Sequence, residues 1–366
     1  MPGQDRSPAP RRGFALRPEG LIAGPAAARA VEAGAALLLV GGPIAFTACE
    51  IVAEAGRVVL PIAEARAWAA KAGLGDETAA AIARVTASRP PFAGLTLDRP
   101  RIMGVVNVTP DSFSDGGDFA DTETAIAHGL ALRQAGADIL DIGGESTRPG
   151  SEPLPVEVEL ARVLPVIKAL AGAGALVSVD TRRALVMVEA IAAGARIVND
   201  ITALAGDPES LGLVARAGVS VVLMHMQGEP RSMQANPVYV EAPLDIHDFF
   251  VERLEACVAA GIPAARIAID PGIGFGKNDR HNIAILQGLG VFHELGVPVL
   301  LGVSRKSFIG RLSRKEPAKQ RLAGSLAAGL AGLDRGVQML RVHDVAETHQ
   351  AMAVWQALVR PVSSAP

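Results

Sequence analysis

The sequence of 366 residues predicts an α/β chain whose larger part is a TIM (β/α)8 barrel, preceded by a small α/β N-terminal unit. From residue 92 onward, eight short apolar runs alternate with eight helix-like stretches. These units occupy about 265 residues, which is the size of such a barrel. No G-x-G-x-x-G motif follows the first run, which argues against the main alternative, a doubly wound open sheet.

Composition and charge exclude several classes of protein. The formal net charge of -3 argues against a general affinity for nucleic acid or anionic membranes, so any anion site must be local. Cys49 and Cys257 lie far apart without metal-type spacing, which predicts free buried thiols in a reducing compartment. No signal peptide is recognisable, and residues 33–48 are too short and too interrupted to span a bilayer. We therefore expect a cytoplasmic protein.

The first 91 residues divide into two expected segments. Residues 1–20 are rich in Pro and Arg and are predicted to be disordered. Residues 21–91 are predicted to form a small accessory α/β unit whose role the sequence does not indicate. Its expected helices are residues 23–33, 63–72 and 77–87, and its expected strands are residues 37–40 and 57–61. Nothing in this unit resembles a catalytic cluster, and residues 88–91 are expected to be a linker.

The barrel is expected over residues 92–360, followed by a flexible tail at residues 361–366. Residues 92–97 are predicted to form a hairpin that leads into the first strand. The expected strands are residues 102–108, 138–142, 176–180, 195–199, 219–226, 266–270, 298–303 and 338–343. The expected helices are residues 122–135, 155–170, 183–193, 208–217, 244–260, 282–295, 318–334 and 345–359.

Polar residues stand at the ends of seven of the eight apolar runs. Because the C-terminal ends of barrel strands meet at one face, these side chains are expected to converge. A single polar residue at a strand end is often only a cap for the next helix, but seven are harder to explain in that way. They are Asn107, Asp141, Asp180, Asn199, His225, Asp270 and the pair Arg341 and His343.

Side-chain alternation predicts which of these residues face the mouth. Asp180 shares a face with Ser178, and Asn199 points opposite to the following acid, Asp200. Met224 lies on the face opposite to His225, so His225 is expected to be a structural histidine and not a ligand.

Carboxylates and an amide at a barrel mouth suit a flat heterocycle rich in donors. An ionised Asp accepts two parallel N–H bonds, and an Asn both donates and accepts. Met224 would supply an adaptable apolar wall. Arg341 and His343, with Asn107 and Arg148, are suited to phosphate oxygens, which often bind after the last barrel strands. A metal site is one alternative, but ligand spacing is lacking; a structural ion pair of Arg341 with a carboxylate is another.

Polar turns follow several strands. Residues 109–117 and 143–150 are predicted to be mobile substrate loops. Residues 304–307 form either a compact cationic turn of the site or a surface charge cluster. The glycine-rich turn at residues 270–277 is not a P-loop, because the spacing and the Ser or Thr after the Lys are missing.

Eight motifs of the barrel segment resemble, in order, those of one family, the dihydropteroate synthases of bacterial folate synthesis. The motifs are MGVVNVTPDSFSDGG, DIGGESTRPG, SVDT, VND, LMHMQG, DPGIGFGK, GVSRKS and RVHDV. The resemblance covers residues 92–359 and leaves the first 90 residues outside. It implies an enzyme that joins 4-aminobenzoate to the methylene carbon of a dihydropterin diphosphate and releases diphosphate, with Mg²⁺ as cofactor.

The resemblance also implies roles for individual residues. The implied pterin pocket consists of Asp180, Asn199, Asp270 and Lys306, with Met224 packing on the ring. The implied diphosphate site consists of Asn107, Arg148, Arg341 and His343, with Mg²⁺ held at Asn107 and Asp111. The implied aminobenzoate contacts are Thr147, Arg148 and Ser307, with Phe113 and Pro149 closing over the substrate. The implied catalytic set is Asn107, Asp180, Asp270, Lys306, Arg341 and His343.

The expected mechanism is a dissociative, cation-like path, which needs no side-chain nucleophile. This agrees with the lack of a Ser/His/Asp or Cys/His set. Two alternatives are a pterin-dependent methyltransferase on the same barrel and a non-catalytic pterin-binding protein. The resemblance further suggests a homodimer, formed through the last helices around residues 322–333. Sensitivity to sulfonamides would depend on the geometry of the loops.

Overall fold

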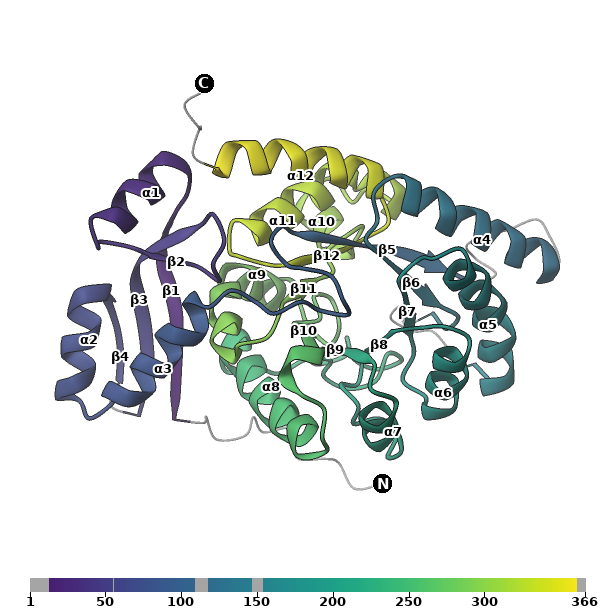
Figure 1. Ribbon diagram of the computed structural model, residues 1–366, viewed down its shortest axis with the longest axis horizontal. Coiled ribbons are helices and arrows are strands. Elements are labelled where there is room, and N and C mark those ends of the chain that lie inside the picture. Colours follow the sequence, from purple (N-terminus) through teal and green to yellow (C-terminus); the bar gives the residue numbers. More distant parts are fainter. Residues whose placement is uncertain (1–12, 55, 109–117, 147–153, 361–366) are drawn as a thin grey trace.

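The computed structural model describes residues 13–54, 56–108, 118–146 and 154–360, and it confirms the predicted barrel (Figure 1). Eight parallel strands are ordered β10-β9-β8-β7-β6-β5-β12-β11, and a parallel bridge between Ile269 and Val299 joins the two ends. The strands are β5 (Arg101–Asn107), β6 (Ile139–Gly143), β7 (Val177–Asp180), β8 (Ile197–Asp200), β9 (Ser220–Met224), β10 (Ile267–Asp270), β11 (Leu300–Leu301) and β12 (Met339–Val342).

Helices follow the strands and surround the sheet (Figure 1). They are α4 (Asp118–Gln134), α5 (Val156–Gly172), α6 (Ala184–Ala192), α7 (Ser210–Ala217), α8 (Ala242–Ala259), α9 (Asp279–Gln287), α10 (Ser307–Leu312), α11 (Leu322–Leu333) and α12 (Val345–Val359). Short 3-10 helices occur at Ala264–Arg266, Leu289–Leu295 (η3) and Ala318–Gln320. No helix in the described part of the chain is both long and apolar enough to cross a membrane.

The barrel interior is apolar at its base and polar at its mouth. The basal layer is built from inward residues near the beginnings of the strands, such as Met103, Ile139 and Met339. Phe92 belongs to this layer, and its antiparallel bridge with Leu95 confirms the predicted hairpin. The side chains of Met103, Ile139, Met339 and Phe92 are fully buried, and that of Leu95 is partly buried. The interior of the barrel is therefore filled by side chains at its base, and the polar residues of the mouth lie above this layer.

Strand β11 is shorter than the sequence predicts. Residues 298–303 were expected to be a strand, but only Leu300–Leu301 pairs with β12. The side chain of Gln338 replaces a ladder bond, because its Oε1 accepts a hydrogen bond from the Val299 N–H at 2.7 Å. The Val299 carbonyl accepts from the N–H groups of Gln338 and Met339. The segment therefore stays in register although regular pairing is interrupted.

The N-terminal unit contains β1 (Phe14–Ile22), α1 (Gly24–Glu32), β2 (Leu37–Leu38), β3 (Ala45–Ala53), β4 (Gly56–Pro61), α2 (Ile62–Lys71) and α3 (Gly75–Thr86). Strand β3 is central, with β1 along one edge and both β2 and β4 along the other. The sequence predicts three helices and two short strands here, but it does not predict β1 or β3. In Figure 1 the unit lies beside the barrel, next to α8 and α9.

The expected disorder of residues 1–20 is wrong for the segment from Phe14, which forms β1. This strand pairs with β3 over its length, from Phe14 with Ala53 to Ile22 with Ala45. Pro18 is compatible with the strand because β1 is an edge strand, where a missing N–H breaks no ladder on the open side. Leu16 is fully buried, so packing overrides the polar composition of the segment.

A buried carboxylate connects the N-terminal unit to the barrel. Glu294, in η3, accepts hydrogen bonds from the Leu16 N–H at 3.2 Å and from Arg84 Nη2 at 2.7 Å. Its other neighbour is His247 of α8, whose Nε2 lies 3.2 Å from Glu294 Oε2. The side chain of Glu294 is 7% exposed. One acid therefore joins β1, α3 and α8, so the N-terminal unit has a fixed attachment point.

Candidate active site

The strand ends bring four polar side chains into direct contact, as the sequence predicted. Arg341 of β12 donates from Nε to Asp141 Oδ2 at 2.6 Å and from Nη2 to Asp180 Oδ2 at 2.7 Å. Asn199 of β8 donates from Nδ2 to Asp141 Oδ2 at 3.0 Å. The pairing registers explain the meeting, because Asp180 stands next to Asn199 across β7 and β8.

One guanidinium thus serves two buried carboxylates. Burial raises the pKa of Asp180 to about 7; Arg341 acts against this rise, whereas the neighbouring Asp141 adds to it. Burial lowers the pKa of Arg341, but the two acids more than offset this effect and hold it above its ordinary value. Among the described residues, the mouth therefore has fewer hydrogen-bond donors than its carboxylates can accept from. A ligand that presents N–H groups to Asp180 would relieve that shortage.

Asp141 is the residue that the sequence reasoning undervalued. It was recognised as a polar strand end but received no role in the site. It is fully buried and accepts from both Arg341 and Asn199, while its Oδ1 has no hydrogen-bond partner among the described residues. Its position on the inward face of β6, opposite Ser178 and Val105 in the neighbouring strands, was available from the alternation pattern.

Asp270 and Lys306 carry opposite charges at the mouth, and each affects the pKa of the other. Asp270 Oδ1 accepts from the Gly272 N–H at 2.7 Å, and burial raises the pKa of Asp270 against the effects of that bond and of Lys306. Burial lowers the pKa of Lys306 to about 8. The Lys306 ammonium lies 4.1 Å from the ring centroid of Phe275. This is cation–π geometry, which holds the ammonium over the ring of Phe275.

Small residues between these acids leave room for a ligand. A Cβ on Gly302 would lie 3.4 Å from Asp270 Oδ2, and a Cβ on Gly143 would lie 3.7 Å from Asp180 Oδ2 and 3.9 Å from Asn107 Oδ1. Asn107 and Asp180 therefore reach the same space above Gly143. Met224 is buried at the end of β9, where it can form an apolar wall.

His343 is uncharged in this setting. Its Nδ1 lies 3.1 Å from Ser304 Oγ, and Ser304 Oγ also accepts from the His343 N–H at 3.2 Å. Burial, followed by the charges of Arg341 and Arg305, lowers the pKa of His343 to about 3. The imidazole can therefore contribute a hydrogen bond to an anion but not a positive charge. Arg305, from the predicted cationic turn, pairs with Asp344, so part of that turn is structural.

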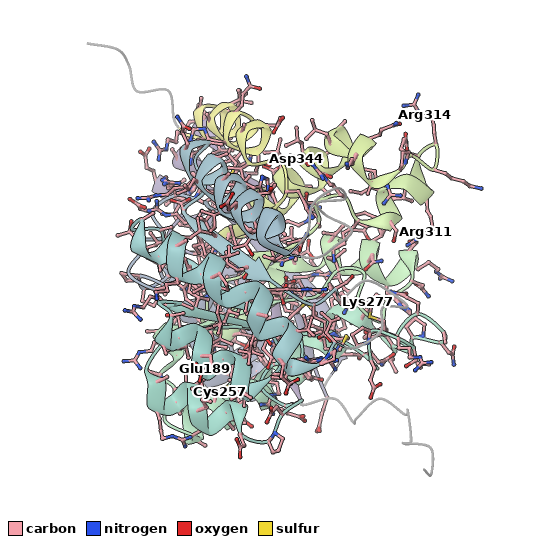
Figure 2. The ribbon with its side chains drawn as sticks, turned by 90° about the vertical axis from the view of Figure 1, so that its right-hand side faces the viewer. Glu189, Cys257, Lys277, Arg311, Arg314 and Asp344 are labelled. Carbon is pink, nitrogen blue, oxygen red and sulfur yellow. The ribbon has the colours of Figure 1, made fainter. Side chains whose placement is uncertain are left out.

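His225 is structural, in agreement with the strand alternation. Its ring packs edge-on against Phe249 at 4.8 Å, and its Nδ1 lies 2.9 Å from Lys277 Nζ. Lys277 also donates to the carbonyl oxygens of His225 and Phe275. Burial lowers the pKa of Lys277 well below its ordinary range. Figure 2 labels this buried lysine and, at the outer edge of the molecule, the exposed Arg314.

Several predicted contacts lie outside the described residues: Asp111, Phe113, Thr147, Arg148 and Pro149. Ser307 is described and is the exposed first residue of α10, directly after Lys306. Among the described residues, no group of three or more His, Cys, Asp or Glu side chains is arranged to hold a metal ion. The charged groups described at the mouth are three carboxylates, Asp141, Asp180 and Asp270, and two cations, Arg341 and Lys306.

A family model, curated sequences and solved structures all identify relatives of the same kind. The model of the family described as "Pterin binding enzyme" matches residues 103–343. Dihydropteroate synthase of Neisseria meningitidis serogroup B is 49% identical over 268 residues, which cover 72% of this chain and 94% of the relative. Dihydropteroate synthase of Xanthomonas albilineans solved with 4-aminobenzoic acid is 52% identical, with a TM-score of 0.70, over 76% of this chain and 99% of that one. The same enzyme solved with 7,8-dihydropteroate is 50% identical with a TM-score of 0.67, over 74% and 97% of the two chains.

Proposed function

We propose roles for the residues of the barrel mouth, starting from the finding that this chain belongs to the pterin-binding enzyme family, among the dihydropteroate synthases. The reaction condenses (7,8-dihydropterin-6-yl)methyl diphosphate with 4-aminobenzoate, giving 7,8-dihydropteroate and diphosphate. The observation that carries the assignment of roles is the guanidinium of Arg341, shared between Asp141 and Asp180 beside Asn199. This cluster combines acceptors for a pterin with a cation for a diphosphate in one mouth.

The pterin is proposed to bind between the two acids. Asp180 would accept N–H bonds from the ring edge, and Asn199 would both donate and accept. Asp270 and Lys306 would contact the opposite edge, with Met224 packing against the ring face. Support comes from the raised pKa of Asp180, because burial makes the carboxylate unfavourable even with its bond from Arg341, and a donor-rich ligand would supply further bonds.

The diphosphate is proposed to bind at the other side of Arg341. Two of the five N–H donors of this guanidinium are engaged by Asp141 and Asp180, so the group can serve an anion without leaving the acids. Neutral His343 would donate a hydrogen bond, and Asn107 would contribute its amide. Arg148 is proposed as a further cation from the loop after β6. Arg341 can therefore keep its ion pairs with Asp141 and Asp180 and still bind the diphosphate.

Magnesium fits this arrangement as an ion shared with the substrate. Mg²⁺ in proteins commonly takes one or two side-chain ligands and completes its shell with phosphate oxygens and water. Asn107 Oδ1, near the open space above Gly143, is such a donor, and Asp111 is proposed as a second one. Bound Mg²⁺ would neutralise charge on the leaving diphosphate.

Aminobenzoate is proposed to enter after the pterin, against Ser307 and the loop residues Thr147, Arg148, Pro149 and Phe113. The carbon–oxygen bond to diphosphate would break ahead of attack by the arylamine, which is a weak nucleophile. The ring would then carry positive charge beside the acids that hold it, and Asp180 and Asp270 would stabilise that charge. No side chain forms a covalent bond in this path.

The N-terminal unit is proposed to be accessory to the barrel of residues 92–360. The family match begins at residue 103, and the contacts of Glu294 hold the unit at a distance from the mouth residues. We further propose a cytoplasmic location, since Cys49 and Cys257 are free and buried as expected in a reducing compartment.

The proposed homodimer would use the outer faces of α11 and α12. Ala327 and Ala331 are exposed on α11, and Val354 and Leu358 on α12 are 58% and 74% exposed. Such a continuous apolar face is suited to a copy of itself. Leu358→Asp is expected to convert a dimer into monomers in sedimentation velocity, whereas a monomeric parent chain would contradict the proposal.

The deciding experiment is release of diphosphate from dihydropterin diphosphate and Mg²⁺, with and without 4-aminobenzoate. Release that requires aminobenzoate is expected from the full chain and is expected to fall by at least about a hundredfold in Arg341→Met. Asp200→Asn is the matched control. Asp200 follows Asn199 but accepts from Thr202 and Leu204 in the next turn, so activity should remain within about threefold. Pterin binding without release would indicate a non-catalytic protein, and methyl transfer would indicate the methyltransferase.

A further inference from the structure

A cleft of about 420 Å³ lies between the N-terminal unit and the barrel, away from the mouth. Its walls come from the β2–β3 turn, the segment that enters β5, the segment between α11 and β12, and Trp355 of α12. The barrel segments lead into the first residues of β5 and β12, so the cleft lies at the base. Strand β5 has seven residues, which places Asn107 about 20 Å from its start.

Apolar side chains predominate in this cleft. Leu39, Ile44, Leu97, Val337 and Trp355 line it, together with a smaller number of polar residues. Pockets that bind small organic molecules have volumes of about 300 to 1,000 Å³ and the same balance of apolar walls with a few polar groups. The volume and the lining are therefore within the range of known small-molecule sites.

The lining carries one buried positive charge without an acidic partner. Arg89 is 8% exposed, and it donates from Nη1 to the carbonyl oxygens of Arg84 and Ala87 and from Nη2 to that of His293. Its Nε has no hydrogen-bond partner among the described residues. Backbone carbonyls satisfy donors but carry no net charge. A buried guanidinium in this setting favours an anion nearby.

The other charges around the cleft balance one another. Arg99 pairs with Asp138 at 2.6 Å, and Arg101 pairs with both Asp138 at 3.1 Å and Asp98 at 2.8 Å. Of the charged residues that line the cleft, Asp98 and Arg99 are opposite in sign, so Arg89 is the remaining charge of the lining. One negative charge on a ligand would complete the balance.

The turn that forms one wall is strained. Val40 and Gly41 have φ angles of 48° and 67°, and the Gly42 N–H donates to the Leu39 carbonyl at 2.9 Å. This is the hydrogen-bond and φ pattern of a type I′ turn, in which a β-branched residue such as Val is unfavourable. The contact of the Val40 N–H with the Val85 carbonyl holds the turn in place. Backbone strain of this kind is concentrated at functional sites.

We propose that this cleft is a second ligand site, which takes a small organic molecule with a compact apolar body and a single carboxylate. The apolar walls would enclose the body, and Arg89 would supply the countercharge. The site lies outside the barrel mouth and depends on the N-terminal unit, so its existence is independent of the assigned reaction.

Trp355 provides a direct report of occupancy. The chain contains two tryptophans, so Trp68→Phe leaves Trp355, which lines the cleft, as the sole one. Adamantane-1-carboxylate is a suitable probe because it is compact, apolar, singly charged and transparent where tryptophan absorbs. Its titration into the full-length Trp68→Phe protein is expected to change Trp355 emission saturably. Adamantane-1-carboxamide, which has the same shape without the charge, is expected to bind roughly tenfold more weakly.

Two glycine variants test the location. Gly42→Leu places a side chain in the cleft, and the only neighbour that its Cβ would meet within 4 Å is the Leu39 carbonyl oxygen at 3.4 Å. It is expected to abolish the saturable change. Gly172→Leu, at the exposed end of α5 with no atom within 4 Å of the new Cβ, is the control and should bind like its parent. No saturable change in the parent protein, or unchanged binding in Gly42→Leu, would overturn the site. Equal affinity for the acid and the amide would overturn its assignment to an anion.

Discussion

Asp180→Asn tests the electrostatics of the mouth through the pH dependence of stability. Two influences on Asp180 oppose each other. The 2.7 Å contact with Arg341 favours the carboxylate, whereas burial and the neighbouring Asp141 favour the protonated acid. Because Asp141 shares the same guanidinium, we expect burial to dominate, with the pKa of Asp180 near 7.

The magnitude follows from the displacement of the pKa. A rise from 3.8 to about 7 is about three units, or about 4 kcal/mol at about 1.4 kcal/mol per unit. The side chain is only 14% exposed, so solvent screens little of this effect. A raised folded-state pKa means that the folded protein keeps its proton after the unfolded chain has lost it. Stability contributed by the protonated acid is therefore present below about pH 4 and lost as the pH rises to about 7.

The assay is urea unfolding of the wild type and of Asp180→Asn between about pH 4 and pH 8. The asparagine does not titrate, so the free energy of unfolding of the wild type minus that of the variant should decrease by up to about 4 kcal/mol across this range. Asp76→Asn, an exposed acid at the start of α3, is the control and should give a nearly constant difference. A difference that is flat, or that increases with pH, for Asp180 would refute the dominance of burial.

Three further predictions concern other buried charges. Burial lowers the pKa of Lys306 to about 8, so its ammonium is lost above that pH and kcat/KM for the pterin substrate should fall there. In Lys306→Arg this fall in kcat/KM should shift to higher pH. A fall at the same pH would contradict the role of the ammonium. Lys277→Met removes donors to the carbonyl oxygens of His225 and Phe275, so we expect about tenfold weaker binding of 7,8-dihydropteroate by calorimetry, with no change in the exposed control Arg314→Met. Glu294→Gln weakens the attachment of the N-terminal unit, so it should lower the free energy of unfolding by about 2 kcal/mol without changing kcat. An unaltered midpoint of urea unfolding would show that the contacts of Glu294 do not anchor the unit.

The sequence predicted the barrel well because its signals are local. Each strand is a short apolar run with a polar end, and the convergence of Asp180, Asn199 and Arg341 follows from the topology of the barrel alone. The partners of Arg341 were harder to predict. The positions of Asp141 and Asp180 in the sequence do not show that they share one guanidinium. That contact depends on how far β6, β7 and β12 are shifted along one another in the barrel.

The N-terminal unit shows where local signals fail. Strand β3 carries small and apolar residues on both faces, and β1 contains Pro18 within a segment rich in Pro and Arg. Each becomes a strand through pairing with the other, which is a non-local contact that no window of sequence reveals. The anchoring of Arg89 to the His293 carbonyl, 204 positions away, was equally invisible, and it turned an expected linker into part of a cleft wall.

The charges of the mouth and of the base differ, and this difference underlies the two ligand sites that we propose. At the mouth, Asp141 and Asp180 share a single guanidinium, and Asp141 Oδ1 has no partner among the described residues, so the deficit is in donors. At the base, Arg89 has carbonyl partners but no acid among the described residues, so the deficit is in negative charge. A donor-rich heterocycle corrects the first deficit and a carboxylate corrects the second. The two proposed sites would therefore differ in the group that each one needs, although 4-aminobenzoate, a substrate proposed for the mouth, also carries a carboxylate.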